Sequence, residues 1–310
     1  MAVRFVVLSS GSRGNSTLIQ GGGPGLLLDL GLGPRVIAER LASVGSSWDR
    51  IGLALLTHTH GDHVNSDTLG QMASRKIPLY CHAEHERGLA KLAGYRAIEA
   101  AGLVRFYDEG PFLTAGGYRV EPLRMAHGPA VTYGFRVEAR GQGESRWVKI
   151  GYVADSGCWT PRLAETLADV DLLGVEFNHD VAMQWESGRH PITIARNVGD
   201  QGHLSNEQGA ALLRAVIERS GRGGPRHVVL LHISSQCNRP QLAVNAARTA
   251  LRASGRRATI HATQQCATHP DLLLTPGRRR RVASPVAAEP VGFPWELDGG
   301  IVQAEPDPDR

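Results

Sequence analysis

The stretch LLTHTHGDHV, residues 55–64, places three histidines and one aspartate directly after an apolar run. In an extended chain alternate side chains point to the same side, so His58 and His60 share one face at the end of a buried strand. The glycine that follows them permits a sharp turn, which brings Asp62 and His63 back towards the same point. Imidazole and carboxylate donors together suit borderline metals such as zinc. The stretch therefore predicts a metal site.

Length and composition predict one large domain followed by a tail. The 310 residues are enough for a layered α/β domain, expected over residues 1–270, and contain no apolar stretch of membrane-spanning length. The N-terminal segment is too short and too quickly polar for a secretory signal, so we expect a cytoplasmic protein. The four cysteines lack CxxC spacing and are expected to be reduced thiols. Residues 276–310 combine an arginine run with proline, alanine and acids, which predicts a disordered tail. The arginine run either contacts nucleic acid or is simply solvated, and the net charge of +4 only weakly favours anionic partners.

Alternating apolar residues and turn residues predict the order of elements. Strands are expected over residues 3–8, 16–20, 25–31, 51–57, 120–125, 133–138, 148–154, 172–177 and 227–234, and helices over residues 34–44, 83–92, 206–220 and 240–253. Gly- and Ser-rich turns between the first three strands predict an opening meander. Runs of strands with helices late in each half predict a layered α/β sandwich.

These features resemble the metallo-β-lactamase fold superfamily, whose signature is the H-x-H-x-D-H element at residues 58–63. Its other site residues are matched by Asp29 in LLLDLG, His127 in RMAHGPAV, Asp155 in GYVADSG and His232 in LLHISS. The resemblance implies a four-layer αββα sandwich. It also implies two divalent metal ions, zinc or manganese, with a bridging hydroxide as the nucleophile.

The resemblance also assigns the ligands of this dinuclear site, all of them imidazoles or carboxylates. They are His58, His60 and His127 for one ion, Asp62, His63 and His232 for the other, and Asp155 between the two. Asp62 and Asp155 would thereby be catalytic, and Asp29 would orient a ligand histidine by hydrogen bonding. A histidine beside an apolar strand is commonly a core residue, so the ligand roles of His127 and His232 depend on the whole set being present.

The element GHLSN, residues 202–206, points to the reaction. It resembles the phosphodiesterase branches of the superfamily, in which such a histidine faces the scissile phosphate. We therefore expect His203 to protonate the leaving group, next to a helix whose N-cap is Ser205 or Asn206. The alternative is that His203 only caps this helix.

Three segments narrow the resemblance to the YycJ (WalJ) group of bacterial metallo-β-lactamase fold proteins, which are regarded as DNA exonucleases. The segments are LSSGSRGNSTLI at residues 8–19, EFNHD at residues 176–180, and GHLSN followed by LLHISSQCNRP at residues 230–240. Within the second, Asn178, His179 and Asp180 would bind substrate phosphate or support ligand residues. The alternative is a polar turn after a strand.

Two positions leave alternatives open. SGSRGN, residues 10–15, is either a tight hairpin or a glycine-rich turn that offers backbone N–H groups to a phosphate. In the YycJ group an aspartate follows the third-site histidine, whereas Gly128 follows His127 here. This departure concerns how substrate is held beside His127 and not the metal.

The resemblance thus implies a metal-dependent phosphodiesterase, with a DNA exonuclease as the preferred interpretation. A small-molecule phosphodiesterase for cyclic nucleotide-like or phosphoribosyl substrates is the alternative with the same chemistry. Two alternatives do not involve phosphodiester hydrolysis. They are a thioesterase or glyoxalase-type hydrolase and a binding module without turnover. No motif surrounds the other histidines, and His82 and His85 are expected on a solvated helix face.

Overall fold

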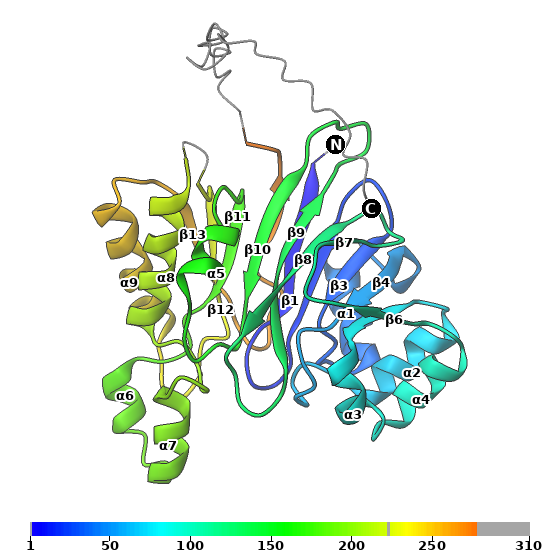
Figure 1. Ribbon diagram of the computed structural model, residues 1–310, viewed down its shortest axis with the longest axis horizontal. Helices are drawn as coiled ribbons and strands as arrows, with labels where there is room; N and C mark the ends of the chain where they lie inside the picture. Colours follow the sequence, from blue (N-terminus) through cyan, green and yellow to red (C-terminus); the bar gives the residue numbers. More distant parts are fainter. Residues whose placement is uncertain (1, 222–223, 278–310) are drawn as a thin grey trace, which may run out of the picture. The chain divides into compact units, whose positions relative to one another are not determined.

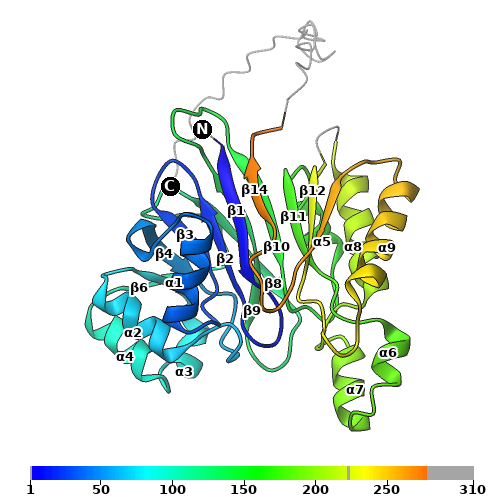
Figure 2. The ribbon, with the colours of Figure 1, turned by 180° about the vertical axis from the view of Figure 1, so that it is seen from behind.

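A computed structural model of the chain describes residues 2–221 and 224–277. Two seven-stranded sheets lie face to face, in the strand orders β14-β1-β2-β3-β4-β5-β6 and β13-β12-β11-β10-β9-β8-β7. Helices cover the outer face of each sheet (Figures 1 and 2). The predicted four-layer αββα sandwich is confirmed. Among the described residues, no helix is long and apolar enough to cross a membrane.

The first sheet and its helices come from the N-terminal part of the chain and from one late strand. The elements are β1 (Val3–Ser9), β2 (Ser16–Gln20), β3 (Gly25–Leu28), α1 (Pro34–Ser43), β4 (Ile51–Leu55), α2 (Ser66–Ser74), β5 (Leu79–His82), α3 (Glu86–Leu89), α4 (Ala93–Ala100), β6 (Val104–Tyr107) and β14 (Asp271–Leu274). Strands β1, β2 and β3 are antiparallel, which confirms the meander, and β3 to β6 run parallel.

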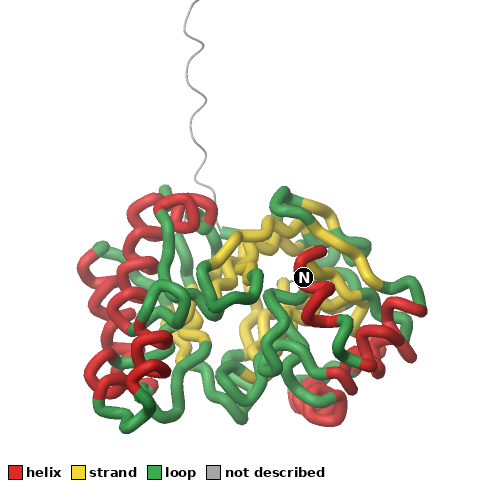
Figure 3. Tube along the Cα trace, turned by 60° about the horizontal axis from the view of Figure 1, so that its bottom comes forward, coloured by secondary structure: helices red, strands yellow, loops and turns green. Residues whose placement is uncertain are grey.

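The second sheet and its helices follow in chain order. The elements are β7 (Phe112–Leu113), β8 (Arg119–Met125), β9 (Thr132–Ala139), β10 (Val148–Val153), α5 (Pro161–Thr166), β11 (Leu172–Glu176), α6 (Val181–Trp185), α7 (Pro191–Val198), α8 (Asn206–Arg219), β12 (His227–Leu231), α9 (Pro240–Ala253) and β13 (Thr259–Ala262). Strands β10 to β13 are parallel, so their carboxyl ends meet at one edge. Figure 3 looks onto this edge, where loops gather between the two helical flanks.

Three apolar clusters hold the layers together. One lies between the sheets, one beneath α1, α2 and α4, and one beneath α5, α8 and α9. Strand β1 contributes to two of them, because Phe5 and Val7 enter the cluster between the sheets while Val6 and Leu8 pack under the helices. Burial on both faces explains why these strands are continuous apolar runs and do not alternate with polar residues.

Several boundaries differ from the prediction. The expected helix over residues 83–92 is a 3₁₀ turn followed by the single turn of α3. The expected solvation of His82 and His85 is wrong, since both are buried and His85 Nε2 donates to the Val131 carbonyl at 3.0 Å. Strand β14 extends past the expected domain end at residue 270 and pairs with β1. From residue 278 onward, the predicted tail lies outside the described residues.

Candidate metal centre

The candidate ligands lie just beyond the carboxyl ends of strands at one edge of the sandwich. Their positions follow β3, β4, β8, β10 and β12: Asp29, His58, His127, Asp155 and His232. Asp29, Asp155 and His232 have left-handed backbone conformations, with φ of 61°, 56° and 53°. Residues other than glycine rarely adopt this conformation, and it persists where the surrounding structure fixes it. The chain therefore turns sharply at these three strand ends.

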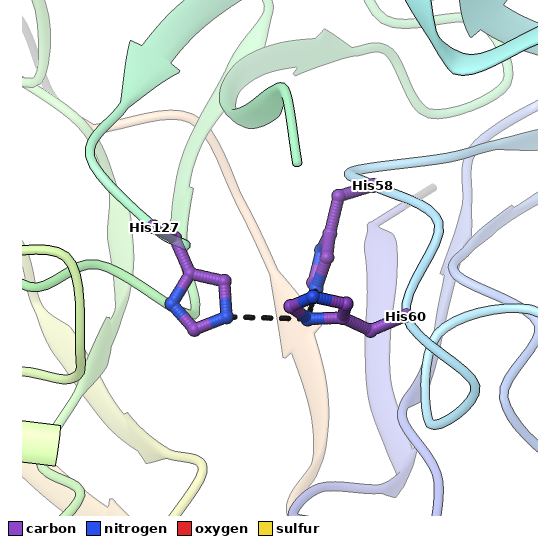
Figure 4. Close-up of side chains that lie close together, drawn as sticks. All are labelled: His58, His60 and His127. Carbon is purple, nitrogen blue, oxygen red and sulfur yellow. Dashed lines mark hydrogen bonds between the residues drawn. The ribbon is translucent and has the colours of Figure 1, made fainter. Parts of the chain in front are cut away.

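His58, His60 and His127 form the first group of candidate ligands (Figure 4). His60 Nδ1 lies 3.0 Å from His58 Nε2 and 3.3 Å from His127 Nε2. Tetrahedral zinc with bonds of about 2.0–2.1 Å separates its ligand nitrogens by about 3.3 Å, so these spacings suit one ion. Burial lowers the pKa of all three imidazoles, which keeps them neutral and able to donate a lone pair.

Asp62, His63 and His232 form the second group. Asp62 Oδ2 lies 3.7 Å from His63 Nε2 and 3.4 Å from His232 Nε2. Burial lowers the pKa of His63, but Asp29 and Asp155 outweigh it and raise the pKa to about 10. Burial likewise lowers the pKa of His232, and Asp155 most strongly raises it above its ordinary value. These carboxylates would attract a metal ion in place of the protons.

Asp155 lies between the two groups. The residue is 1% exposed, and its Oδ2 is 2.5 Å from His63 Nε2 and 3.9 Å from His58 Nε2. Neither carboxylate oxygen makes a hydrogen bond of acceptable geometry with any described residue. A buried carboxylate is costly unless a cation or hydrogen bonds compensate its charge. Cations would compensate this charge, and with both groups of candidate ligands beside it Asp155 could serve ions held by either group.

A buried hydrogen-bond network orients the histidines. Asp29 Oδ2 accepts from His63 Nδ1 at 2.8 Å, and Asp29 Oδ1 accepts from the Thr57 backbone N–H at 2.9 Å. Thr57 Oγ1 lies 3.0 Å from His58 Nδ1 and donates to Asp29. With Nδ1 engaged in this way, Nε2 of both His58 and His63 faces the site. Asp29 thus has the orienting contact that was expected, while Thr57 was not identified from the sequence.

The SGSRGN loop is tied to the ligand loop by Asn15. Its Oδ1 accepts from the Gly11 N–H at 2.8 Å, and its Nδ2 donates to the Asp62 carbonyl at 3.2 Å and lies 2.9 Å from His63 Nε2. The Asn15 N–H also donates to the Asp62 carbonyl at 2.7 Å. These contacts hold the loop in place beside the second group of ligands.

His203 points into the site and is held by two carboxylates. Its Nδ1 lies 2.8 Å from Glu176 Oε1 and 3.2 Å from Asp155 Oδ1. Burial lowers its pKa, but Glu176 and Asp155 outweigh this and raise the pKa to about 9. Ser205 caps α8 by accepting from the Gln208 N–H, which confirms that expected N-cap. The alternative in which His203 caps the helix is therefore excluded.

Glu176 is a site residue that sequence reasoning missed. It is fully buried at the end of β11 and also accepts from the backbone N–H groups of Ser156 and Leu204, at 2.9 and 3.1 Å. Because β10 and β11 are parallel neighbours, Glu176 lies beside Asp155. An acidic residue at the end of a fully apolar strand was the available signal. Together with Asp155, His203 and His232 it forms a further set of four donors within 4.8 Å.

The three polar residues after Glu176 differ in their roles. Asn178 Nδ2 donates to the His232 carbonyl at 2.9 Å and lies 3.0 Å from His232 Nδ1. Asp180 caps α6 by accepting from the Met183 N–H at 3.0 Å. His179 is buried, and its Nδ1 has no hydrogen bond within the described part of the chain. Of the three, only Asn178 contacts a candidate ligand by a hydrogen bond.

Comparison with known proteins agrees with this fold. The family described as "Beta-lactamase superfamily domain" matches residues 26–233. "Exodeoxyribonuclease YycJ" of Bacillus anthracis is 27% identical over 247 residues, which cover 78% of this chain and 87% of that protein. The metallo-beta-lactamase fold protein YhfI from Bacillus subtilis aligns with a TM-score of 0.59 at 17% identity, over 87% of this chain and all of that one. A diphosphatase from the PhnP family aligns with a TM-score of 0.57 at 17% identity, over 88% and 99%.

Proposed function

This chain belongs to the beta-lactamase superfamily and is a metal-dependent hydrolase, and on this premise we propose that it is a phosphodiesterase that removes nucleotides from an end of DNA. The observation that carries the proposal is the pair formed by His203 and Glu176, 2.8 Å apart beside the candidate metal ligands. An alkoxide is a poor leaving group, so its departure from phosphorus is accelerated by a positioned proton donor, by about 10²- to 10⁴-fold.

The two groups of ligands would hold the metal ions, with Asp155 shared between them. When bound, two divalent ions activate a water molecule at neutral pH and offset the charge that develops on the phosphate. Zinc and manganese both accept this set of nitrogen and oxygen donors, and we propose one of the two. Asp29, Thr57 and Asn178 orient His63, His58 and His232 respectively, and the Gly202 carbonyl accepts from His127 Nδ1.

His203 would deliver the proton to the departing oxygen from Nε2, because its Nδ1 donates to Glu176 and lies near the Asp155 carboxylate. The two carboxylates stabilise the imidazolium and fix the plane of the ring. Glu176 in turn is held by two backbone N–H groups, so the pair is rigid. DNA as the substrate is supported by the activity named for the Bacillus anthracis relative. Binding of its phosphates to cationic side chains would give an affinity that falls with salt.

The test is hydrolysis of 5′-labelled single- and double-stranded DNA by the purified chain with zinc or manganese restored. A ladder of labelled products is expected if nucleotides are removed from the 3′ end, and a labelled mononucleotide alone if they are removed from the 5′ end. RNA of the same sequence should be cleaved more slowly. The His203→Gln variant should retain both ions and lose cleavage. His190→Gln is the matched control, because His190 is an exposed N-cap of α7.

Three outcomes would contradict parts of the proposal. DNA fragments produced by internal cuts would show that the chain is an endonuclease and not an exonuclease. Cleavage of bis(p-nitrophenyl) phosphate without cleavage of DNA would indicate a small-molecule phosphodiesterase. Hydrolysis of thioesters or lactams, with no phosphodiester cleaved, would refute phosphodiester chemistry altogether.

A further inference from the structure

A cavity of about 420 Å³ lies beside the metal centre, next to His127. Its walls are formed by residues 124–131 and 158–160, with Leu163 and Gln201 completing them. The volume falls within the range of about 300 to 1,000 Å³ that is usual for sites holding small organic groups. Of these residues only His127 belongs to the candidate ligands. The cavity is therefore a space adjacent to the metal centre and not part of it.

Trp159 gives this cavity a flat aromatic wall. The side chain is partly buried against the cluster beneath α5, which limits its freedom to move. The residue is half-buried, and its Nε1–H makes no hydrogen bond with the described residues, so this group can donate to a ligand. Met125 and Leu163 add apolar surface to the same cavity. The lining is thus suited to a planar group with polar edges.

The charge of the lining favours an anionic ligand. Arg124 is the only fully charged side chain among the described lining residues, and none of them is a carboxylate. Arg124 Nη1 lies 3.1 Å from Glu109 and 3.5 Å from Glu84. All three side chains are more than half exposed, and ion pairs of this kind are weak. A phosphate that arrives at the cavity can therefore compete for the guanidinium.

Gly128 leaves the cavity open towards the metal ligands. Its φ of 51° is left-handed, and a Cβ built there would stand 3.8 Å from His60 Cε1. Because glycine has no side chain, no side chain at this position separates the cavity from His60. A planar group in the cavity could therefore be joined by a few bonds to a phosphate that lies beside His60 and His127.

We propose that this cavity, the Trp159 pocket, binds the base of the nucleotide whose phosphodiester bond is hydrolysed, by stacking on the Trp159 indole. The inference rests on the proposed function and names the part of the substrate that the pocket recognises. Every base has a flat face, so stacking tolerates any sequence, as an exonuclease requires. The unpaired Trp159 Nε1–H and the amide of Gln201 offer further hydrogen bonds to base edges.

The first test compares two single-stranded oligonucleotides that differ only in the terminal nucleotide, which is normal in one and abasic in the other. The abasic residue is placed at the 5′ end in one pair and at the 3′ end in a second pair. For the end that is degraded, the wild type should lose about tenfold or more in kcat/KM on the abasic substrate. Trp159→Ala should cleave both substrates with the low kcat/KM that the wild type shows on the abasic one. Trp159→Phe should keep most of the wild-type preference for the normal end.

Trp185→Ala is the control, because Trp185 is 58% exposed on α6 and does not line the cavity. This variant should discriminate as the wild type does. Equal kcat/KM of the wild type on normal and abasic ends would overturn the proposal while leaving the phosphodiesterase intact. A preference that persists in Trp159→Ala would also overturn it.

A second measurement does not depend on turnover. Thymidine 5′-monophosphate added to the metal-free protein should quench tryptophan fluorescence, and Trp159→Phe should remove this quenching. Equal quenching in the wild type and in Trp159→Phe would overturn the proposal that the Trp159 pocket binds the base. Quenching lost in the variant, with no DNA cleaved by the wild type, would support nucleotide binding and refute only the proposed function.

Discussion

Replacing Asp29 with asparagine should weaken one metal site by about 10- to 100-fold. Asp29 is fully buried, and its carboxylate accepts from His63 Nδ1, the Thr57 N–H and Thr57 Oγ1. Asparagine has the same shape and tolerates the left-handed backbone at this position. Its amide nitrogen is a donor, however, so it must replace the acceptor of either the His63 Nδ1–H or the Thr57 backbone N–H. In the first case the Nδ1 proton loses its partner, and the tautomer that leaves Nε2 free for metal is no longer favoured.

The magnitude can be worked out in two ways. A hydrogen bond to a charged group contributes about 1.5–3 kcal/mol. Loss of a residue that orients a metal ligand weakens metal binding by about 10- to 100-fold, or about 1.4–2.8 kcal/mol. The two ranges overlap. We therefore expect the variant to bind zinc more weakly than the wild type at the site that includes His63. Zinc binding by His58, His60 and His127 should change less.

The assay is competition for zinc between the metal-free protein and a chromophoric chelator. Asp49→Asn is the matched control, since the Asp49 side chain is 82% exposed and pairs only with Arg75 among the described residues. Circular dichroism should show that both variants remain folded. Two zinc affinities within twofold of the wild type in Asp29→Asn would refute the reasoning.

Three further predictions follow from the same structure. His203→Gln should retain two ions and lose about 10²- to 10⁴-fold in phosphodiester turnover, and a wild-type rate would contradict its role as proton donor. In the metal-free chain, carboxylates hold the pKa of His63 at about 10 and raise that of His232, so binding must release protons. Metal affinity should therefore rise with pH up to about pH 10, where free His63 loses its proton, and calorimetry in buffers of different ionisation enthalpy that detects no proton release would contradict this. Ending the chain after Pro270 removes β14 with its buried Leu274 and should lower the free energy of unfolding by about 2–5 kcal/mol. A chain ended after Gly277 should keep the wild-type urea midpoint, and equal midpoints for the two chains would contradict the role of β14.

The candidate metal ligands could be picked out from the sequence because the decisive pattern is local. His58, His60, Asp62 and His63 fall within six positions at the end of one strand. Glu176 could not be found in this way, because its importance arises from β11 lying parallel to β10. Nothing in the sequence next to Glu176 indicates that pairing. Thr57 was missed for a similar reason, since its hydroxyl links His58 to Asp29, which follows a different strand.

The misplaced elements also have physical causes. Residues 83–92 show helical spacing, but α3 ends at Leu89, and Leu92 is extended, with φ of −94° and ψ of 128°, as the N-cap of α4. His85 turns inward and contributes to the capping of the short 3₁₀ turn, which keeps it off the surface. Strand β14 is only four residues long and pairs with β1 at the opposite end of the chain. Long-range pairing of so short a strand leaves no local periodicity to detect.

The central claim is that two metal ions held by these histidines and aspartates carry out phosphodiester hydrolysis. The most direct measurement is the metal content of the purified chain together with its hydrolysis of bis(p-nitrophenyl) phosphate, before chelation, after it, and after zinc or manganese is restored. We predict two ions per chain, with hydrolysis lost on chelation and regained with the metal. Hydrolysis that survives complete removal of metal, or a fully active chain that holds fewer than two ions, would contradict the account.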